Sequence, residues 1–325
     1  METALKGEGL EQHLRPHQSP APRSSMLSYQ HGYHAGNHAD VLKHVVLGEV
    51  LGAMQRKDTP LFALDAFASR GLYELDSAEA LKNREFDTGI GRIWPLRNEA
   101  MPGGIRRWLE AVRSMNNDER CTAIPGSTAL LQHWQRPQDR LAACEMHPQE
   151  FEALRAAFRS SRVLALHKRD AYEALGALLP PKEKRGLVLL DPSYEEKGEY
   201  RRVARAVAGV YPHFRAGVYL IWYPLLPAGR HKELFHELKK SGIRKVLRAE
   251  LDGRWLDGGR PDGSRSDNNT GCFGKQDAPM QMQGSGMLIV NPPWHAMQAI
   301  HESLVWMKAA LCPTGQARCD WLVPE

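Results

Sequence analysis

The sequence has few cysteines, and none of them are closely spaced. Five cysteines occur in 325 residues, and no pair shows the Cys-x-x-Cys spacing of a zinc site or a redox motif. A small secreted domain held together by disulfides needs a denser set. The pattern therefore predicts reduced thiols in a cytoplasmic protein. The five are Cys121, Cys144, Cys272, Cys312 and Cys319.

Long apolar runs are also missing. No run approaches the roughly 18 residues that would span a bilayer, so we expect no contact with a membrane. Residues 1–25 lack the apolar core of a secretory signal and carry Pro16, Pro20 and Pro22. Acidic residues in this stretch argue against an organelle-targeting role. We expect residues 1–25 to be a disordered leader, with Met26 as a candidate start.

The charge balance favours no single class of partner. The formal net charge is +5, with 25% charged and 42% hydrophobic residues. This content is typical of a soluble globular chain with one large core, or a core plus a subdomain. The positive excess suits a polyanion, but many enzymes with small substrates share it.

Short apolar runs recur along the chain, each followed by an acidic or turn residue and then by a helical stretch. The runs are 61–64, 141–144, 163–166, 187–190, 218–222 and 287–290. Strands this apolar, alternating with helices, are typical of a mainly parallel sheet covered on both faces. Such α/β sheets bind ligands beyond the carboxyl ends of their strands.

Two segments interrupt the alternation. Residues 74–124 separate the first two runs by far more than one crossover helix requires, and their spaced tryptophans and aliphatic residues indicate a small helical insertion. Residues 252–283 are rich in Gly, Asp, Ser and Asn, and predict a flexible loop between two late strands. We therefore expect one domain, residues 26–325, with an insertion at about 74–124 and a loop at about 252–283.

The sharpest local motif is Asp191-Pro192-Ser193-Tyr194, directly after an apolar run. Methyltransferases that act on amino groups use an Asp/Asn-Pro-Pro-aromatic turn in this place. The amine of adenine is a poor nucleophile because its lone pair is delocalised into the ring. A carboxylate and a backbone carbonyl that accept its two hydrogens localise the lone pair, and an aromatic ring stacks on the extruded base. An ordinary strand-end Asp-Pro turn is the alternative.

A second copy, Asn291-Pro292-Pro293-Trp294, matches the general pattern more fully. A catalytic turn should follow the strand beside the cofactor-binding first strand, where the strand order reverses. Asp191 meets this requirement, whereas Asn291 ends the last apolar run. We interpret the Asn291 turn as structural.

Acidic residues that follow the predicted strands suggest a nucleotide-like cofactor. Glu145 is placed to bind two ribose hydroxyls, and Asp170 to bind an adenine amine. Each could instead be a helix N-cap. The segment 61–73 (LFALDAFASRGLY) occupies the place of a glycine-rich cofactor loop, but it keeps only Gly71 of the expected glycines.

An unusual density of histidine and tyrosine opens the domain in residues 28–44. A metal site is one interpretation, although the clean i, i+4 geometry with a carboxylate third ligand is missing. Core or capping roles for His34 and His38 are a second. Interleaved aromatic and basic groups also suit single-stranded RNA.

From Met26 to Glu325, the chain resembles the bacterial 23S rRNA adenine-N6 methyltransferases of the RlmJ type. The residues that carry the resemblance are 26–44 (MLSYQHGYHAGNHADVLKH), 125–127 (PGS), 145–148 (EMHP), 191–200 (DPSYEEKGEY), 221–224 (IWYP), 242–245 (GIRK), 285–294 (SGMLIVNPPW) and 321–325 (WLVPE). The opening motif is the most specific of these.

The resemblance implies a Rossmann-like class I methyltransferase with a mainly parallel seven-stranded sheet, which uses S-adenosylmethionine to methylate a specific adenine. The implied partner is 23S rRNA, protein-free or partly assembled, and we expect a cytoplasmic monomer. The implied catalytic residues are Asp191, Pro192 and Tyr194. The implied cofactor residues are His44, Phe67, Ser127, Glu145, Asp170, Ala171 and Asp191. Tyr29, His31 and Lys43 are implied to engage or position RNA, and no metal is implied.

The chain departs from the family pattern at four positions around the expected cofactor pocket. Phe67 replaces a histidine, Ser69 and Ala171 replace glycines, and Ser193 replaces a proline. Phe67 cannot donate a hydrogen bond, and serine resists a positive φ. These changes motivate a second hypothesis, an RNA-binding or ribosome-assembly protein with a decayed cofactor site. A DNA adenine methyltransferase, which shares the catalytic turn, is a third.

Overall fold

The computed structural model describes residues 30–117, 119–253 and 282–325. The expected leader, residues 1–25, lies outside the described residues, as do Tyr29 and all but the ends of the expected loop at 252–283. Within the described part, no helix is long and apolar enough to cross a membrane.

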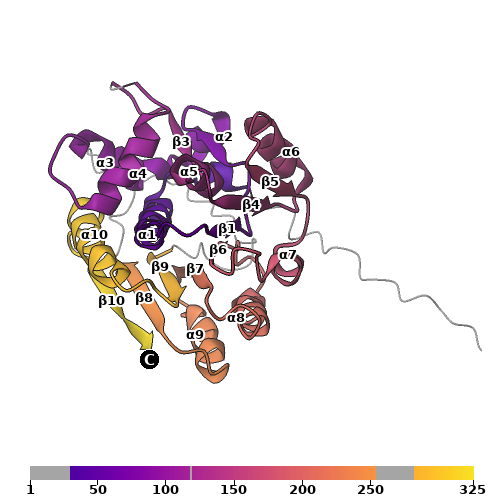
Figure 1. The fold of residues 1–325 in the computed structure, drawn as a ribbon. Helices are drawn as coiled ribbons and strands as arrows, with labels where there is room; N and C mark the ends of the chain where they lie inside the picture. The colour runs from indigo at the N-terminus through magenta and orange to yellow at the C-terminus, as the bar shows by residue number, and fades with distance from the viewer. Residues whose placement is uncertain (1–29, 118, 254–281) are drawn as a thin grey trace, which may run out of the picture.

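One eight-stranded sheet forms the centre of the molecule, in the order β10-β8-β9-β7-β6-β1-β4-β5 (Figure 1). Its strands are β1 (Phe62–Asp65), β4 (Arg140–Cys144), β5 (Leu164–His167), β6 (Gly186–Leu190), β7 (Val218–Leu225), β8 (Val246–Asp252), β9 (Gly284–Val290) and β10 (Gln316–Val323). Neighbours from β5 through β7 pair in parallel, whereas β9 and β10 are antiparallel to the strands beside them.

The expectation of a mainly parallel α/β sheet is confirmed, but the expectation of seven strands is wrong. The eighth strand is β10, which pairs along the whole of β8 from Gln316 onward. It adds to the outer edge of the sheet and leaves the order of the other seven strands unchanged.

Helices cover both faces of the sheet. They are η2 (His31–Tyr33), α1 (His38–Gln55), α2 (Ala78–Asn83), η3 (Glu85–Thr88), α3 (Ile90–Ile93), η4 (Trp94–Leu96), α4 (Gly103–Arg113), α5 (Ser127–Trp134), α6 (Pro148–Ala157), α7 (Ala171–Leu178), α8 (Glu199–Val210), α9 (His231–Lys240) and α10 (Ala296–Leu311). Buried residues of α1, α4, α5 and α10 pack on one face, and those of α7, α8 and α9 on the other. Burial of both faces explains why the central strands are apolar along their whole length.

Between β1 and β4 the chain forms a compact subdomain. Two short strands, β2 (Leu72–Glu74) and β3 (Ala123–Pro125), pair antiparallel, and the elements from α2 to α4 lie between them in sequence. This is the stretch in which we expected a helical insertion. Trp108 and Val112 of α4 are buried in the same core cluster as α1, so the subdomain packs directly on that helix.

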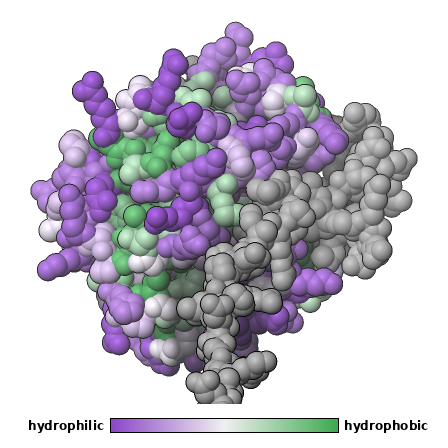
Figure 2. Space-filling view, turned by 90° about the vertical axis from the view of Figure 1, so that its right-hand side faces the viewer, coloured by the Kyte–Doolittle hydropathy of each residue, from purple (hydrophilic) through white to green (hydrophobic). Residues whose placement is uncertain are grey.

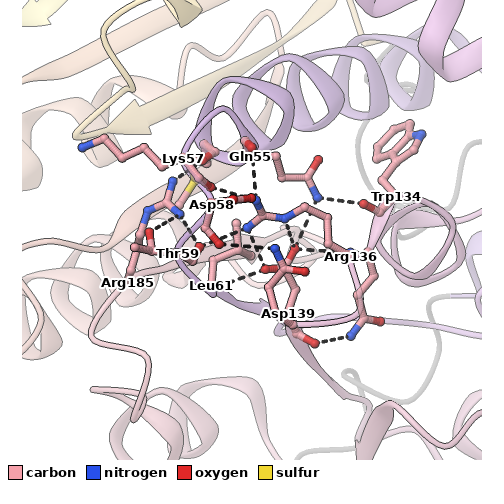
Figure 3. A network of polar contacts seen from close by, with 12 residues as sticks. Gln55, Lys57, Asp58, Thr59, Leu61, Trp134, Arg136, Asp139 and Arg185 are labelled. Atoms are coloured by element: carbon pink, nitrogen blue, oxygen red, sulfur yellow. Dashed lines mark hydrogen bonds and ion pairs between the residues drawn. The ribbon is translucent and has the colours of Figure 1, made fainter.

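Arginines hold the carboxyl end of α1 (Figure 3). Arg136 donates to the carbonyl of Gln55 at 3.1 Å and to Asp139 at 2.9 Å, and Arg185 donates to another carbonyl in the last turn. Asp139 accepts from the backbone N–H of Leu61 at 3.1 Å. Carbonyls that end a helix lack intrahelical donors, and the guanidinium groups supply them. The network fixes the end of α1 to the start of β1.

The other edge of the sheet is β5, which has a strand partner on one side only. Figure 2 views the molecule from the side on which α6, β5 and α7 lie, and it shows hydrophobic side chains among hydrophilic ones. Val163, directly before β5, is 50% exposed. The exposed Arg162 before this short strand, and Lys168 and Arg169 after it, are the kind of charged residues that disfavour pairing with another chain.

Candidate active site

Three carboxylates lie together at the end of the sheet where the parallel strands finish. Because β1, β4 and β6 run in parallel, their carboxyl ends meet there. Asp65 is the last residue of β1, and Glu145 and Asp191 directly follow β4 and β6. This is the edge at which α/β sheets bind ligands, and it brings together residues separated by more than a hundred positions.

A buried lysine connects Asp191 to helix α1. The ammonium of Lys43 lies 2.5 Å from Asp191 Oδ2 and 2.8 Å from Asp40 Oδ1. Asp40 in turn accepts from His31 Nε2 at 2.9 Å and from the backbone N–H of Gly36 at 2.9 Å. Asn37 caps α1 and thereby fixes its first turn, which carries Asp40. The opening segment thus places the ammonium of Lys43 against the Asp191 turn.

Electrostatics keep Lys43 and Asp40 ionised. Burial alone would lower the pKa of Lys43, but the Asp191 and Asp40 carboxylates raise it above its usual range. Burial opposes ionisation of Asp40, yet His31 and Lys43 hold its pKa well below the ordinary value. Only one oxygen of Asp191 is fixed by the ammonium, and a carboxylate oxygen has further lone pairs to offer.

The expected RNA residues therefore point inward where the structure describes them. Lys43 is only 4% exposed, and His31 lies against Asp40 and the ring of Tyr73, whose centroid is 5.2 Å away. Lys43 contacts Asp191 and His31 contacts Asp40, so both side chains hold another side chain in place. No set of three His, Cys, Asp or Glu side chains suited to a metal occurs in the described part of the chain.

Asp65 is a site residue that we did not predict. It is fully buried and accepts from Ser127 Oγ at 2.6 Å and Thr128 Oγ1 at 2.7 Å, both through Oδ2. Its other oxygen, Oδ1, is buried without a partner among the described residues. Burial raises the pKa of Asp65 despite these two hydroxyl donors. The signal was its position at a strand end, the same signal that indicated Glu145.

The loop that follows β1 accommodates Ser69, which stands where the family has a glycine. Ser69 has φ 50°, so it adopts the left-handed conformation that the family's glycine would favour. Its backbone N–H donates to Glu145 at 2.8 Å, and its hydroxyl donates to Glu150 at 2.9 Å. Glu145 also accepts from the N–H of His147 at 2.6 Å, and burial raises the pKa of Glu145. The serine is tolerated because its polar groups find partners in this conformation.

The start of α7 lies beside this loop. Asp170 is the N-cap of α7 and accepts from two backbone N–H groups of its first turn, while its other oxygen faces Arg202 at 3.2 Å. The capping alternative therefore holds for Asp170. Ala171 is the buried first residue of the helix, where N–H groups lack intrahelical acceptors. The ring of Phe67 meets that of Tyr172 edge-on, with centroids 5.6 Å apart.

His44 lies one turn beyond Asp40 on α1 and is 2% exposed. Burial lowers its pKa to about 3, a shift that Asp40 opposes and Lys43 assists. The imidazole is therefore neutral at physiological pH. A neutral ring can donate or accept one hydrogen bond without adding charge to the carboxylate edge.

The aromatic residue of the Asp191 turn is buried in the core. Tyr194 has φ 54° and is 5% exposed, and its hydroxyl donates to the carbonyl of Trp222 at 2.6 Å. Its ring stacks on Tyr200 with centroids 4.2 Å apart. We expected this ring to stack on an extruded base, but the structure buries it against Tyr200 instead. Pro192 is buried next to Asp191.

The second turn lies at the opposite edge of the sheet. β9 is antiparallel to β7, and Val290 pairs with Tyr219 near the start of β7. Asn291 therefore follows β9 at the amino edge of the parallel strands, where its amide donates to the carbonyl of Gly217 at 3.0 Å. Trp294 is 89% exposed there. Asn291 and Asp191 cannot belong to one site.

Comparison with known proteins agrees with this geometry. Residues 58–261 and 274–323 match the family described as "Ribosomal RNA large subunit methyltransferase D, RlmJ". A protein named "Ribosomal RNA large subunit methyltransferase J" from Escherichia coli is 36% identical over 302 residues, which cover 92% of this chain and all of that protein. The protein of the same name from Haemophilus influenzae is 36% identical over 303 residues, again 92% of this chain and all of the relative.

A solved structure of a protein from Legionella pneumophila is similar throughout. Its TM-score is 0.76 at 29% identity, and the alignment covers 89% of this chain and 98% of that one. The expected class I methyltransferase fold, methyltransferase activity and use of S-adenosylmethionine are confirmed by the family match together with the strand order. The chain belongs to the RlmJ family of ribosomal RNA large subunit methyltransferases.

Proposed function

We propose that this protein transfers a methyl group from S-adenosylmethionine to N6 of a specific adenine in 23S rRNA. The observation that carries the proposal is the Asp191 carboxylate, which Lys43 holds at the carboxyl edge of the sheet beside the unpartnered oxygen of Asp65. The names of the two relatives supply the substrate class, and the catalytic turn supplies the chemistry of an amino group.

The residues at this edge fit S-adenosylmethionine. The buried Oδ1 of Asp65 needs a donor, and the ammonium of the cofactor's methionine part is one. Glu145 has lone pairs left for ribose hydroxyls. The N–H of Ala171, the first residue of α7, is not used by the N-cap of that helix and suits a ring nitrogen of the adenine. Phe67 and Tyr172 add an aromatic wall. The bound cofactor supplies an electrophilic methyl group on sulfonium.

At the target, Asp191 acts as a hydrogen-bond acceptor. Its carboxylate accepts one N6 hydrogen of the adenine and the Pro192 carbonyl accepts the other, which localises the nitrogen lone pair toward the methyl carbon. Lys43 fixes one oxygen of Asp191, so that the other keeps a constant direction. His31 supports the same arrangement through Asp40. The proton that N6 loses after methylation passes to the oxygen of the Asp191 carboxylate that Lys43 does not hold, and from there to water.

Tyr29, His31 and Lys43 are proposed to act on the RNA side of the site, the last two by positioning the catalytic turn. We further propose a cytoplasmic monomer that acts on protein-free or partly assembled 23S rRNA. Against the hypothesis of a decayed cofactor site, Ser69 holds the required left-handed conformation and Asp65 offers an unfilled acceptor. These features favour an active enzyme.

The test compares the two Pro-containing turns. Asp191→Ala is expected to abolish methylation of a 23S rRNA fragment, whereas Asn291→Ala retains it, with S-adenosylmethionine binding measured in both by calorimetry. An active Asp191→Ala variant, or an inactive Asn291→Ala variant that binds cofactor, would contradict the assignment. A wild-type protein that binds RNA but no cofactor would support the decayed-site hypothesis. Competition with a matched DNA oligonucleotide tests the choice of nucleic acid.

A further inference from the structure

Glu199 is a buried carboxylate that the proposed chemistry does not use. It is the first residue of α8 and is 5% exposed. The hydroxyl of Tyr172 donates to its Oε1 at 3.2 Å, and the backbone N–H of Tyr194 donates to the same carboxylate. One side chain thus joins two segments that are neither adjacent in sequence nor part of one element.

The two segments are the two halves of the site. Tyr172 is the second residue of α7 and contacts Phe67 of the first-strand loop, so it belongs to the cofactor end. Tyr194 is the last residue of the catalytic turn and has a left-handed φ of 54°. This conformation is strained for a residue with a Cβ, so it needs contacts that hold it. The Glu199 carboxylate holds the backbone of Tyr194 at this position.

We propose that Glu199 is a positioning residue that fixes the catalytic turn relative to the cofactor-binding end of α7. The inference rests on the proposed function and deepens it. With Glu199 ionised, both donors bind one rigid acceptor, and Asp191 stays aligned with the bound cofactor. Without it, the turn relaxes from its left-handed conformation and the carboxylate of Asp191 shifts, although Lys43 still pairs with it.

The charges around Glu199 make its effect depend on pH. Burial raises the pKa of Glu199 to about 7, and Glu196 of the preceding loop acts in the same direction. The Tyr172 hydroxyl from α7, the Tyr194 amide from the turn and Arg202 from α8 all oppose this rise. A protonated carboxyl group loses acceptor capacity, so the turn is held fully only above about pH 7.

Glu250 provides a matched control. It is also 5% exposed, and it accepts from the hydroxyl of Tyr223 at 2.7 Å, but it lies on β8. Glu199→Gln and Glu250→Gln therefore make the same chemical change in equally buried sites. Tyr172→Phe and Tyr223→Phe form a second matched pair that removes only the donor and preserves the ring.

The experiment measures kcat from pH 6 to pH 9 for methylation of a 23S rRNA fragment, with Kd for S-adenosylmethionine from calorimetry. Wild-type kcat is expected to fall as the pH drops through about 7. Glu199→Gln should lower kcat between about 10- and 100-fold at pH 8, as expected for a misplaced catalytic group, and should remove that step. Tyr172→Phe should lower kcat by less, and both control variants should keep the wild-type profile.

Three results overturn the inference. They are a Glu199→Gln variant with the wild-type profile, equal losses in Glu199→Gln and Glu250→Gln, and a loss in Tyr223→Phe as large as that in Tyr172→Phe. If Glu199→Gln fails to fold, the tyrosine pair decides the question alone. A wild-type protein that methylates no adenine in 23S rRNA fails the proposed function itself, and this outcome is seen before any Glu199 variant is made.

Discussion

Replacement of Lys43 by methionine is the sharpest test of the buried charge set. The substitution keeps the volume of the side chain and removes the cation that lies 2.8 Å from Asp40 and 2.5 Å from Asp191. Removing one partner of a buried ion pair costs about 3 to 5 kcal/mol, because the remaining charge is left without compensation. His31 still pairs with Asp40, so we expect a loss near the lower end, about 3 kcal/mol.

Urea denaturation at pH 7.5 measures this loss, with Arg84→Met as the control. Arg84 pairs with Asp87 at the surface, where both side chains are at least half exposed, and its removal should cost less than about 1 kcal/mol. Methylation by the Lys43→Met variant should fall about 100-fold, since Asp191 loses its fixed direction. Adding Asp40→Asn should recover stability but not activity.

The reasoning is refuted if Lys43→Met unfolds within 1 kcal/mol of the wild type and keeps its kcat. It is also refuted if the double variant with Asp40→Asn is less stable than Lys43→Met alone. Either result would mean that the ammonium contributes little where the structure places it, and that Asp191 is positioned by its own backbone.

Further predictions concern the cofactor end, the buried histidine and the clamp on α1. Asp65→Asn should weaken binding of S-adenosylmethionine at least about 10-fold in calorimetry, because a charge-assisted hydrogen bond is lost; unchanged affinity would remove Asp65 from the site. The pKa of His44 is about 3 in the fold and 6.5 ordinarily, so its contribution to stability is complete above pH 6.5 and is lost as the pH falls. The loss of unfolding free energy between pH 7.5 and pH 5 should therefore be about 2 kcal/mol smaller in His44→Gln, and an equal loss would contradict burial of a neutral ring. Arg136→Ala should destabilise the fold by about 2 to 3 kcal/mol in urea, against less than about 1 kcal/mol for the exposed Arg155→Ala.

The central fold could be predicted because its strands are buried on both faces. Such strands are continuous apolar runs in the sequence, and six of the eight were found in this way. Two strands were missed because charged residues interrupt their apolar pattern. β8 carries Arg248 and Glu250, and β10 lies at an edge of the sheet and is only partly buried. Its residues, Gln316–Val323, alternate between exposed and partly buried positions, and the segment includes Arg318 and Asp320.

The site was predicted in part. What the sequence could not predict are the contacts between residues that lie far apart in the chain. Asp191 was identified from a motif of four residues, but its contact with Lys43 spans 148 positions and has no local signature. Asp65 carried the same strand-end signal as Glu145, and only its unpartnered oxygen distinguishes it. The motif also predicted that the ring of Tyr194 would be exposed at the site and stack on an extruded base. Tyr200 and the carbonyl of Trp222 instead fix that ring in the core, which no pattern in the turn could indicate.

Helix α1 is held by arginines at its carboxyl end, far from the end that carries Lys43. From Gln55 to Lys43 it rises about 18 Å, at about 1.5 Å per residue. A tilt of about 5° at the arginine-bound end would carry the ammonium sideways by about 1.6 Å, enough to separate it from its carboxylate partners. Substitutions on the amino side of the sheet can therefore silence this enzyme without touching any group that meets cofactor or RNA.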